Sequence, residues 1–235
     1  MLLLTGCYHF GSVPVKRGKF ITIEGLDGCG KSTQLERLAA VLRDNGVDLI
    51  VTREPGGTAV GEQIRALILD SATLGLAPWT ELALMFASRA QHIKEVIQPA
   101  LAEGRWVLCD RFTDSTEAYQ GGGRKLGSEP VLTLHRTLCQ DLWPDMTILM
   151  DSEVAASVQR ARRRNKARQG GDDAIPDEGR FERENRAFFT RVRDTYLAIA
   201  KREPKRVFVV DARQKLETVH KEIVAAVRER LGLAR

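Results

Sequence analysis

The chain has 235 residues, of which 43% are hydrophobic and 29% are charged, as in an ordinary globular α/β domain. No apolar run approaches the ~20 residues of a membrane-spanning helix, so a membrane protein is not expected. The net charge of +5 suits anionic ligands, but much of it lies in residues 160–168 and does not demonstrate nucleic-acid binding. Four scattered cysteines, without metal-site or disulfide spacing, favour a reducing cytoplasm.

Residues 1–18 are predicted to form a flexible extension. The segment Leu4-Thr5-Gly6-Cys7 superficially resembles a lipoprotein cleavage box. However, no basic residue precedes it, and its apolar stretch is shorter than the ~7–15 residues of a signal peptide. The folded domain is therefore expected to comprise residues 19–235.

The first predicted strand, Phe20–Glu24, leads into the segment Gly25-Leu26-Asp27-Gly28-Cys29-Gly30-Lys31-Ser32, and a helical pattern follows it. Gly, four residues, then Gly-Lys-Ser/Thr in this context is typical of a loop whose backbone N–H groups surround phosphate oxygens. Lys31 should reach the β- and γ-phosphates, and Ser32 should offer a hydroxyl to Mg²⁺. The thiolate of Cys29 would be favoured beside Lys31, or Cys29 is simply a small residue that fits. The expected ATP-binding residues are Gly25, Leu26, Asp27, Gly28, Cys29, Gly30, Lys31, Ser32 and Thr33.

Strands and helices alternate along the rest of the chain. Four further apolar segments are predicted strands: Leu49–Thr52, Trp106–Cys109, Thr147–Met150 and Val207–Val210. One helix should end at Asn45-Gly46, a long one should run from Pro78 to Gly104 with an interruption around Pro99, and others should cover about 61–69, 130–139, 154–164, 183–200 and 217–231. The pattern predicts an α/β fold of the P-loop kinase kind, with a five-stranded parallel sheet and helices on both faces. The Gly/Asp-rich stretch Gln169–Gly179 indicates a mobile lid over about residues 160–180.

Charged residues follow two of the predicted strands. Arg53-Glu54-Pro55-Gly56-Gly57 follows the second, with Arg65 on the next helix, and Asp110-Arg111-Phe112 follows the third. Taken singly, Arg53-Glu54 could be a surface ion pair, and the later run Gly121–Gly123 a flexible loop. Asp110 is favoured as a Mg²⁺ or water-positioning group, since a phosphate loop lies elsewhere in the chain. Several arginines at the carboxyl edge of the sheet predict a pocket for a second phosphate.

With these segments in view, the chain resembles the thymidylate kinases. The matching stretches are Phe20–Thr33, Thr52–Gly57, the helix around Phe86 and Arg89, Asp110–Arg111, Ser115 to Arg124, and the basic run after Asp151. The Arg-Glu-Pro-Gly-Gly and Tyr-Gln-Gly-Gly-Gly-Arg segments are specific to that family among small P-loop kinases. The resemblance implies transfer of a phosphoryl group from ATP·Mg²⁺ to dTMP, a step of dTTP biosynthesis, and a homodimer.

The resemblance also implies roles for individual residues. Arg65, Arg89 and Arg111 would hold the phosphate of dTMP, and Phe86 would stack on thymine. Many relatives have the stacking aromatic residue four positions before the arginine, where this chain has Met85. Thr116 and Gln120 would contact the edge of the base, and Tyr119 would lie against the sugar. Asp27 would approach the 3′-hydroxyl, and Glu54 would organise the site.

Arg160, Arg162, Arg163, Arg164, Lys166 and Arg168 form a dense cationic run. Arginines that close over the γ-phosphoryl group stabilise its spread charge in the transition state. In the family this arginine comes from the phosphate loop or from the lid, and the loop has Gly28 before Cys29. The expected catalytic residues are therefore Lys31, Asp110 and the lid residues Arg160, Arg162 and Arg164, and the expected metal ligands are Ser32 and Asp110.

Three other functions remain open at this point. The first is a different P-loop nucleoside or nucleotide kinase, although a nucleoside kinase would need a carboxylate base and not three phosphate-facing arginines. The second is an ATPase that uses residues 160–168 to clamp nucleic acid, which would give strongly salt-dependent binding. The third is a non-catalytic nucleotide-binding switch, against which Lys31, Asp110 and the lid arginines argue. No membrane and no nucleic-acid partner is expected.

Overall fold

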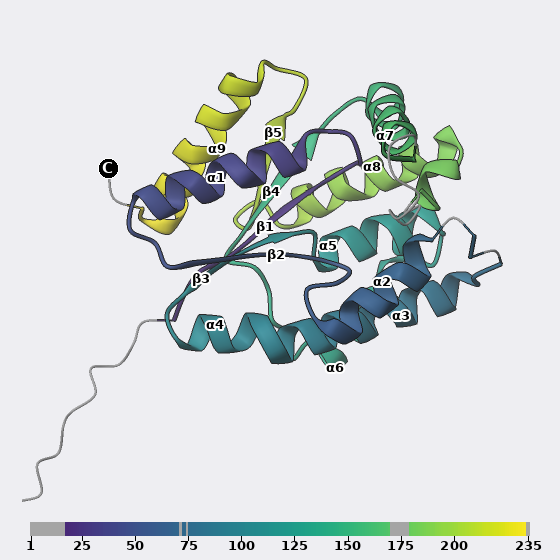
Figure 1. The fold of residues 1–235 in the computed structure, drawn as a ribbon, viewed down its shortest axis with the longest axis horizontal. Coiled ribbons are helices and arrows are strands. Elements are labelled where there is room, and N and C mark those ends of the chain that lie inside the picture. Colours follow the sequence, from purple (N-terminus) through teal and green to yellow (C-terminus); the bar gives the residue numbers. More distant parts are fainter. Residues whose placement is uncertain (1–16, 71, 74, 170–178, 234–235) are drawn as a thin grey trace, which may run out of the picture.

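The computed structural model describes residues 17–70, 72–73, 75–169 and 179–233. Five parallel strands form one sheet in the order β2-β3-β1-β4-β5 (Figure 1). Their bounds are β1 Phe20–Gly25, β2 Leu49–Arg53, β3 Trp106–Asp110, β4 Met146–Asp151 and β5 Val207–Asp211. The sequence prediction of all five is confirmed, and each strand ends one residue later than predicted.

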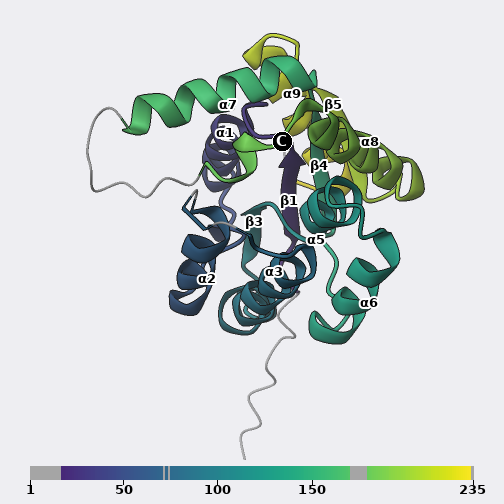
Figure 2. The same cartoon turned by 90° about the vertical axis from the view of Figure 1, so that its right-hand side faces the viewer.

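Helices cover both faces of the sheet (Figures 1 and 2). On one face α1 and α9 pack through Leu38, Leu42 and Ile223 against Ile21 and Ile148 of the sheet. The opposite face is covered mainly by α3, α4, α6 and α8. The described helices are α1 Lys31–Asp44, α2 Ala59–Leu69, α3 Pro78–His92, η1 Ile93–Ile97, α4 Gln98–Ala102, α5 Thr113–Thr116, η2 Glu117–Gly123, α6 Ser128–Leu138, α7 Val154–Gln169, η3 Phe181–Arg183, α8 Arg186–Arg202 and α9 Leu216–Leu231.

The long helix after Pro78 is interrupted as predicted. Before Pro99 the chain forms the π-helical segment η1, and Pro99 lies in the first turn of α4. Proline lacks an N–H and its ring collides with the carbonyl four residues earlier, so a regular α-helix cannot continue through it.

The glycine-rich segment after Tyr119 is not the flexible loop that one interpretation of the sequence allowed. It forms the π-helix η2, in which Gly121 and Gly123 are buried. A Cβ on Gly122 would lie 2.0 Å from Thr195 Oγ1, and one on Gly123 would lie 2.5 Å from the ring of Phe188. These glycines therefore let α8 approach η2 closely, which fixes the position of Tyr119.

The described chain begins inside the predicted extension. The N–H of Gly18 donates to the carbonyl of Leu101 at 2.9 Å, and Arg17 forms an ion pair with Asp145 at 3.0 Å. These two residues belong to the folded domain, while the rest of the predicted extension, residues 1–16, lies outside the described residues. So does 170–178, the middle part of the predicted lid. None of the helices described in the structure is long and apolar enough to cross a membrane.

Candidate active site

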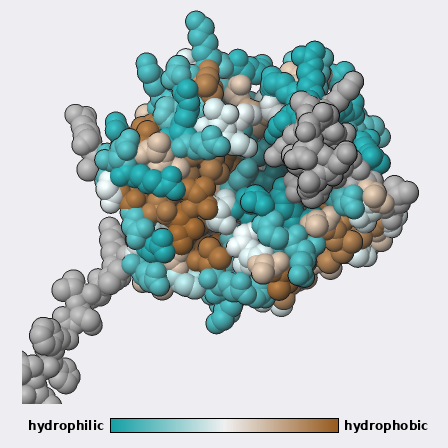
Figure 3. All heavy atoms as spheres, viewed as in Figure 1, coloured by the Kyte–Doolittle hydropathy of each residue, from teal (hydrophilic) through white to brown (hydrophobic). Residues whose placement is uncertain are grey.

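Two adjoining cavities open at the carboxyl edge of the sheet, and Arg164 of α7 lines both of them. The larger has a volume of about 830 Å³ and is lined by the phosphate loop, and the smaller has a volume of about 110 Å³. The molecular surface toward α7 is mostly hydrophilic, whereas a hydrophobic area lies on the side of the edge strand β2 (Figure 3). Five residues line both cavities: Asp27, Glu54, Arg65, Arg111 and Arg164.

The phosphate loop lies between β1 and α1. Gly28 and Gly30 have φ angles of 80° and 99°, a backbone conformation that side chains with a Cβ rarely adopt. The buried ammonium of Lys31 donates to the carbonyls of Gly25 and Leu26 at 3.0 and 2.9 Å, and lies 3.7 Å from the Asp27 carboxylate. Lys31, Ser32 and the N-terminus of α1 thus face the larger cavity, a concentration of positive charge suited to phosphate.

Asp110 lies at the end of β3 and lines the same cavity as Ser32. Its Oδ1 atom is buried and has no hydrogen-bond partner among the described residues. A carboxylate oxygen withdrawn from water without a partner is costly unless a cation binds it. Mg²⁺ prefers oxygen ligands and is commonly held by one or two carboxylates together with substrate phosphates. Asp110 and Ser32 therefore fit the expected metal.

Arg111 lies between the two cavities and donates several hydrogen bonds. Its Nη1 atom donates to Ser115 Oγ at 2.8 Å and to Tyr196 OH at 3.1 Å, and its Nη2 atom donates to Asp27 Oδ1 at 2.8 Å. Burial would raise the pKa of Asp27, but the cations of Arg111 and Lys31 hold that pKa well below its usual range. Asp27 is therefore an anion throughout the working pH range and fixes one side of the Arg111 guanidinium.

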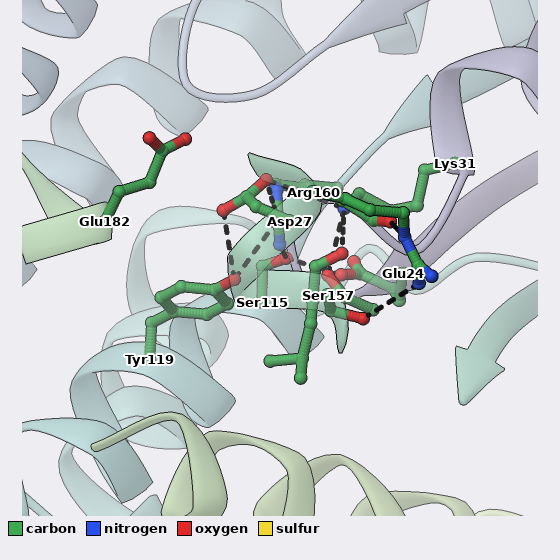
Figure 4. Close-up of polar contacts among 12 residues, drawn as sticks. Glu24, Asp27, Lys31, Ser115, Tyr119, Ser157, Arg160 and Glu182 are labelled. Carbon is green, nitrogen blue, oxygen red and sulfur yellow. Dashed lines mark hydrogen bonds and ion pairs between the residues drawn. The ribbon is translucent and has the colours of Figure 1, made fainter. Parts of the chain in front are cut away.

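Tyr119 of η2 packs beside this pair. Its hydroxyl donates to Asp27 Oδ2 at 3.2 Å, and the Arg111 guanidinium lies 5.0 Å from its ring centre. Figure 4 shows Asp27 beside the Tyr119 hydroxyl, with Glu182 separate from them on another segment. Tyr119 lines the smaller cavity, as the predicted sugar contact requires.

The predicted roles of Phe86 and Arg89 need correction. Phe86 of α3 is fully buried in the hydrophobic core, and Met85 lines the smaller cavity in its place. Arg89 is 2% exposed and, within the described part of the chain, lines neither of the two cavities. The reason is the direction of the helix face: Met85 faces the cavity, whereas Phe86 turns into the core and leaves no ring face for a base.

Arg89 instead supports the site from behind. Its Nε atom donates to Glu54 Oε2 at 2.7 Å, and its Nη2 atom donates to Thr116 Oγ1 at 2.9 Å. Nη1 is buried without a partner in the described structure, and so is Oε1 of Gln120, whose Nε2 donates to Glu81 at 2.7 Å. Glu54 is further held by His92 Nδ1 at 2.9 Å. Arg89 Nη1, a donor, and Gln120 Oε1, an acceptor, are thus free to bind a ligand.

Arg65 lies on α2, the helix that follows β2, as the sequence predicted. It lines both cavities, and its Nη1 atom donates to the carbonyl of Pro55 at 3.0 Å. Thr33 lines the larger cavity beside Ser32. Leu26 and Cys29 are buried and shape the loop through packing.

The three predicted lid arginines do not act alike. Arg160 donates from Nε to the carbonyl of Gly28 at 2.6 Å and lines the larger cavity, and Arg164 lines both cavities. Arg162 is directed elsewhere: it donates to the carbonyls of Glu182 and Glu184 at 3.0 and 3.3 Å, and it lines a separate groove with Arg163. A direct contact of Arg162 with the transferred phosphoryl group does not fit this position, because residues 160 and 162 lie on different sides of a helix.

Sequence reasoning missed several residues of the site. Glu24, Ser115 and Tyr196 form a buried network behind Arg111, and Phe181 and Glu182 line the smaller cavity. Glu24 could have been found from the sequence, because it is a charged residue within the largely apolar run Phe20–Gly25. Nothing in the sequence marked Tyr196, which comes from α8, far along the chain.

Comparisons with known proteins agree with this geometry. Residues 23–223 match the family model described as thymidylate kinase. The chain is 48% identical to the thymidylate kinase of Trichlorobacter lovleyi over 91% of this chain and 99% of that protein. It is 49% identical to that of Pseudomonas syringae pv. tomato over 93% and 99%. A crystal structure of thymidylate kinase from Ehrlichia chaffeensis superimposes with a TM-score of 0.70 at 32% identity, covering 90% of this chain and 99% of that one. The chain belongs to the thymidylate kinase family.

Proposed function

We propose that the larger cavity binds ATP with Mg²⁺, that the smaller binds dTMP, and that the phosphoryl group is transferred between them. The chain is a thymidylate kinase, a phosphotransferase that converts dTMP to dTDP. One observation carries the assignment of its parts: the five residues that line both cavities include three arginines. Guanidinium groups at the junction of two cavities suit a reaction that passes a phosphoryl group across it.

On the ATP side, the backbone N–H groups from Gly25 to Ser32 and the N-terminus of α1 bind the phosphates. Lys31 moves from the loop carbonyls to the β- and γ-phosphate oxygens, where it neutralises charge. Asp110 and Ser32 would hold Mg²⁺, which would neutralise negative charge on the phosphate oxygens. Arg160 and Arg164 stabilise the charge that spreads over the γ-phosphoryl oxygens.

On the dTMP side, Arg65 and Arg111 hold the phosphate at the junction. Tyr119 lies against the sugar where a 2′-hydroxyl would project, and Asp27 approaches the 3′-hydroxyl. Thymine presents a carbonyl acceptor next to an N–H donor. Arg89 Nη1 and Gln120 Oε1, the buried donor and acceptor without partners among the described residues, match that pattern. We therefore assign Arg89 to the base edge and not to the phosphate, a contact that requires the smaller cavity to extend toward Nη1 when dTMP binds.

Chemistry at this junction needs no general base. The attacking oxygen belongs to a phosphate that is already anionic, so no proton has to leave it. Three histidines in the described chain are engaged elsewhere: His92 with Glu54 and Thr52, His135 with Thr113, and His220 with Gln34. Orientation of the two substrates and electrostatic stabilisation by arginines supply the catalysis.

A coupled ADP-release assay tests the proposal with dTMP, dUMP, ribosyl-TMP, dCMP, AMP, GMP, thymidine and no acceptor. Strong turnover with dTMP, with dUMP lower, is expected, because one methyl group distinguishes these bases by only ~1–3 kcal/mol. Turnover with thymidine but not dTMP would contradict the arginine pocket. ADP release that requires no acceptor and rises with polynucleotide would favour the nucleic-acid-dependent ATPase.

We also propose a homodimer that forms away from the cavities. Three large hydrophobic side chains are exposed on the adjacent helices α2 and α3: Val60 (47%), Leu67 (47%) and Trp79 (58%). A patch of this kind is typical of a protein–protein interface. Sedimentation should show a dimer for the wild type, a monomer for Leu67→Glu, and a dimer for Leu216→Glu, a control at an exposed leucine on α9.

A further inference from the structure

Glu24 is a fully buried carboxylate directly behind the junction of the two cavities. It is the second-last residue of strand β1, directly before the phosphate loop. Its Oε1 atom accepts from the N–H of Phe112 at 2.7 Å. Its Oε2 atom accepts from the hydroxyls of Ser115 at 2.5 Å and Tyr196 at 3.0 Å. Figure 4 shows Glu24 and Ser115 close together beneath the loop that carries Asp27.

Those same two hydroxyls hold Arg111. Ser115 and Tyr196 both accept from Arg111 Nη1, at 2.8 and 3.1 Å. A hydroxyl group has one hydrogen and two lone pairs. If each hydrogen is donated to Glu24, the lone pairs remain to accept from the guanidinium. When the carboxylate takes these hydrogens, neither of them points at the guanidinium, and both hydroxyls are free to accept from Arg111.

The backbone of Arg111 has an unfavourable conformation, which explains why several hydrogen bonds hold this residue in place. Its φ angle is 73°, in the left-handed region that is unfavourable for a side chain with a Cβ. Its N–H donates to the carbonyl of Ile23 at 3.0 Å, and the next N–H, of Phe112, donates to Glu24. Glu24 is thus bonded both to the main chain beside Arg111 and to the hydroxyls at the end of its side chain.

We propose that Glu24 is a positioning residue that orients Arg111 for the phosphate of dTMP through Ser115 and Tyr196. The inference rests on the role assigned to Arg111 under the proposed function. Glu24 lines neither cavity in the described structure, so it acts through Arg111 and not on the substrate. Burial, reinforced by the carboxylate of Asp114 and opposed by Arg111, raises the pKa of Glu24 to about 7.

Glu24→Gln tests the proposal with little change of shape. The amide oxygen must face the N–H of Phe112, so the amide NH₂ faces the two hydroxyls and donates to them. One of the two hydroxyl hydrogens can go to the other hydroxyl, since Ser115 Oγ and Tyr196 OH lie 2.7 Å apart, but the remaining hydrogen turns toward Arg111 Nη1, where donor meets donor. The Kd of dTMP should rise about tenfold, the cost of one lost charge-assisted hydrogen bond, while the Kd of thymidine, which has no phosphate, should change less than about twofold. A purely structural defect would weaken both ligands.

Three further variants make the result decisive. Glu117→Gln is the matched control, since Glu117 is equally buried but pairs with Arg202, and it should leave both Kd values unchanged. Tyr196→Phe removes one of the two hydroxyls and should give a smaller loss of dTMP affinity, which also serves if Glu24→Gln does not fold. In an Arg111→Ala background, Glu24→Gln should have no further effect on dTMP binding.

The outcomes separate the inference from the proposed function. If Arg111→Ala leaves the preference for dTMP over thymidine intact, Arg111 does not bind the phosphate, and both statements are wrong. If Arg111→Ala removes that preference but Glu24→Gln and Tyr196→Phe do not weaken it, only the positioning role is wrong. An equal loss of dTMP affinity from Glu24→Gln in both backgrounds would also overturn it, because the residue would then act without Arg111.

Discussion

The Nε atom of Arg160 donates to the carbonyl oxygen of Gly28 at 2.6 Å, which joins α7 to the phosphate loop. Because Gly28 has no Cβ, the backbone of α7 can also approach the loop closely at this point. A Cβ at position 28 would lie 2.2 Å from the carbonyl oxygen of Ser157 and 2.9 Å from the nitrogen of Ala161, both in the backbone of α7. The loop therefore has no arginine at position 28 and no space for one. The guanidinium groups come instead from Arg160 and Arg164 of α7, which line the larger cavity.

Gly28→Ala should displace α7 and lower kcat at least about tenfold, since the arginines move away from the phosphoryl group. The binding of thymidine in the smaller cavity should change little. Gly46→Ala is the control: it also has a positive φ angle, 75°, but nothing lies within 4 Å of an added Cβ. Steady-state kinetics and thermal unfolding separate the two, because backbone strain costs both variants about 1–2 kcal/mol of stability and only the clash should affect turnover.

The lid arginines should differ in kinetic importance. Arg164→Ala should lower kcat more than tenfold, or about 1.4 kcal/mol of barrier, with little change in the KM for dTMP. Arg163→Ala is the matched control, since Arg163 lines the separate groove on α7. Arg162→Ala should act mainly on stability, because it removes bonds to the carbonyls of Glu182 and Glu184. Turnover that falls as far for Arg162→Ala as for Arg164→Ala would contradict this division.

Much of the fold could be predicted because its signals are local. The buried strands are short β-branched and apolar runs, and Asn45-Gly46 and Pro99 mark helix boundaries through their own backbone limits. The segment Glu117–Gly123 could not be predicted, because its consecutive glycines are typical of loops. Only the close approach of α8, visible in three dimensions, explains why glycines form a buried helix there.

Residue types and spacing located the site but not the side-chain directions within it. Lys31, Asp110, Arg65 and Arg111 follow strands, so the topology of a parallel sheet brings them to one edge. Phe86 and Arg89 lie on a long helix, where a one-residue shift moves a side chain about 100° around the axis and exchanges core for cavity. Such a shift depends on how α3 packs, which no local pattern in the sequence encodes.

Asp110→Asn should raise the Mg²⁺ concentration needed for half-maximal turnover at least about tenfold, because a neutral amide oxygen is a weaker ligand than a carboxylate. The change keeps the shape of a buried side chain whose Oδ1 has no partner in the described structure. Chelation of Mg²⁺ in the wild type should abolish turnover while dTMP still binds, as measured by calorimetry. An unchanged Mg²⁺ requirement in Asp110→Asn would remove Asp110 from the metal site.

Cys29 should react with alkylating agents more slowly than a free thiol. Burial raises the pKa of its thiol, and the nearby cations of Lys31 and Arg111 only partly oppose that effect. The side chain is 5% exposed, and its sulfur would lie 3.1 Å from a Cβ at position 25. Peptide mapping after timed exposure to iodoacetamide measures the rate at Cys29. Fast labelling that ATP blocks would instead support the thiolate that its position beside Lys31 suggested.

His135 should make the protein less stable in mild acid. Its imidazole is fully buried against Trp143, with ring centres 3.9 Å apart, and its Nε2 has no hydrogen-bond partner in the described part of the chain. Burial, together with the charge of Arg89, lowers its pKa to about 4. The unfolded chain, with an ordinary histidine pKa of about 6.5, therefore binds more protons between these values. The contribution of His135 to stability is complete above pH ~6.5 and is lost as the pH falls toward ~4.

Glu24 acts in the opposite direction over part of the same range. Its pKa is raised to about 7 from an ordinary value of 4.5, so the folded state binds the extra proton, and its contribution to stability is lost as the pH rises through about 7. The two effects oppose each other in the wild type. Denaturant unfolding of His135→Gln at several pH values should therefore show stability that decreases more steeply from pH 5 to pH 7 than in the wild type, since the rising contribution of His135 is gone. A profile parallel to that of the wild type would mean that His135 is not kept neutral by burial.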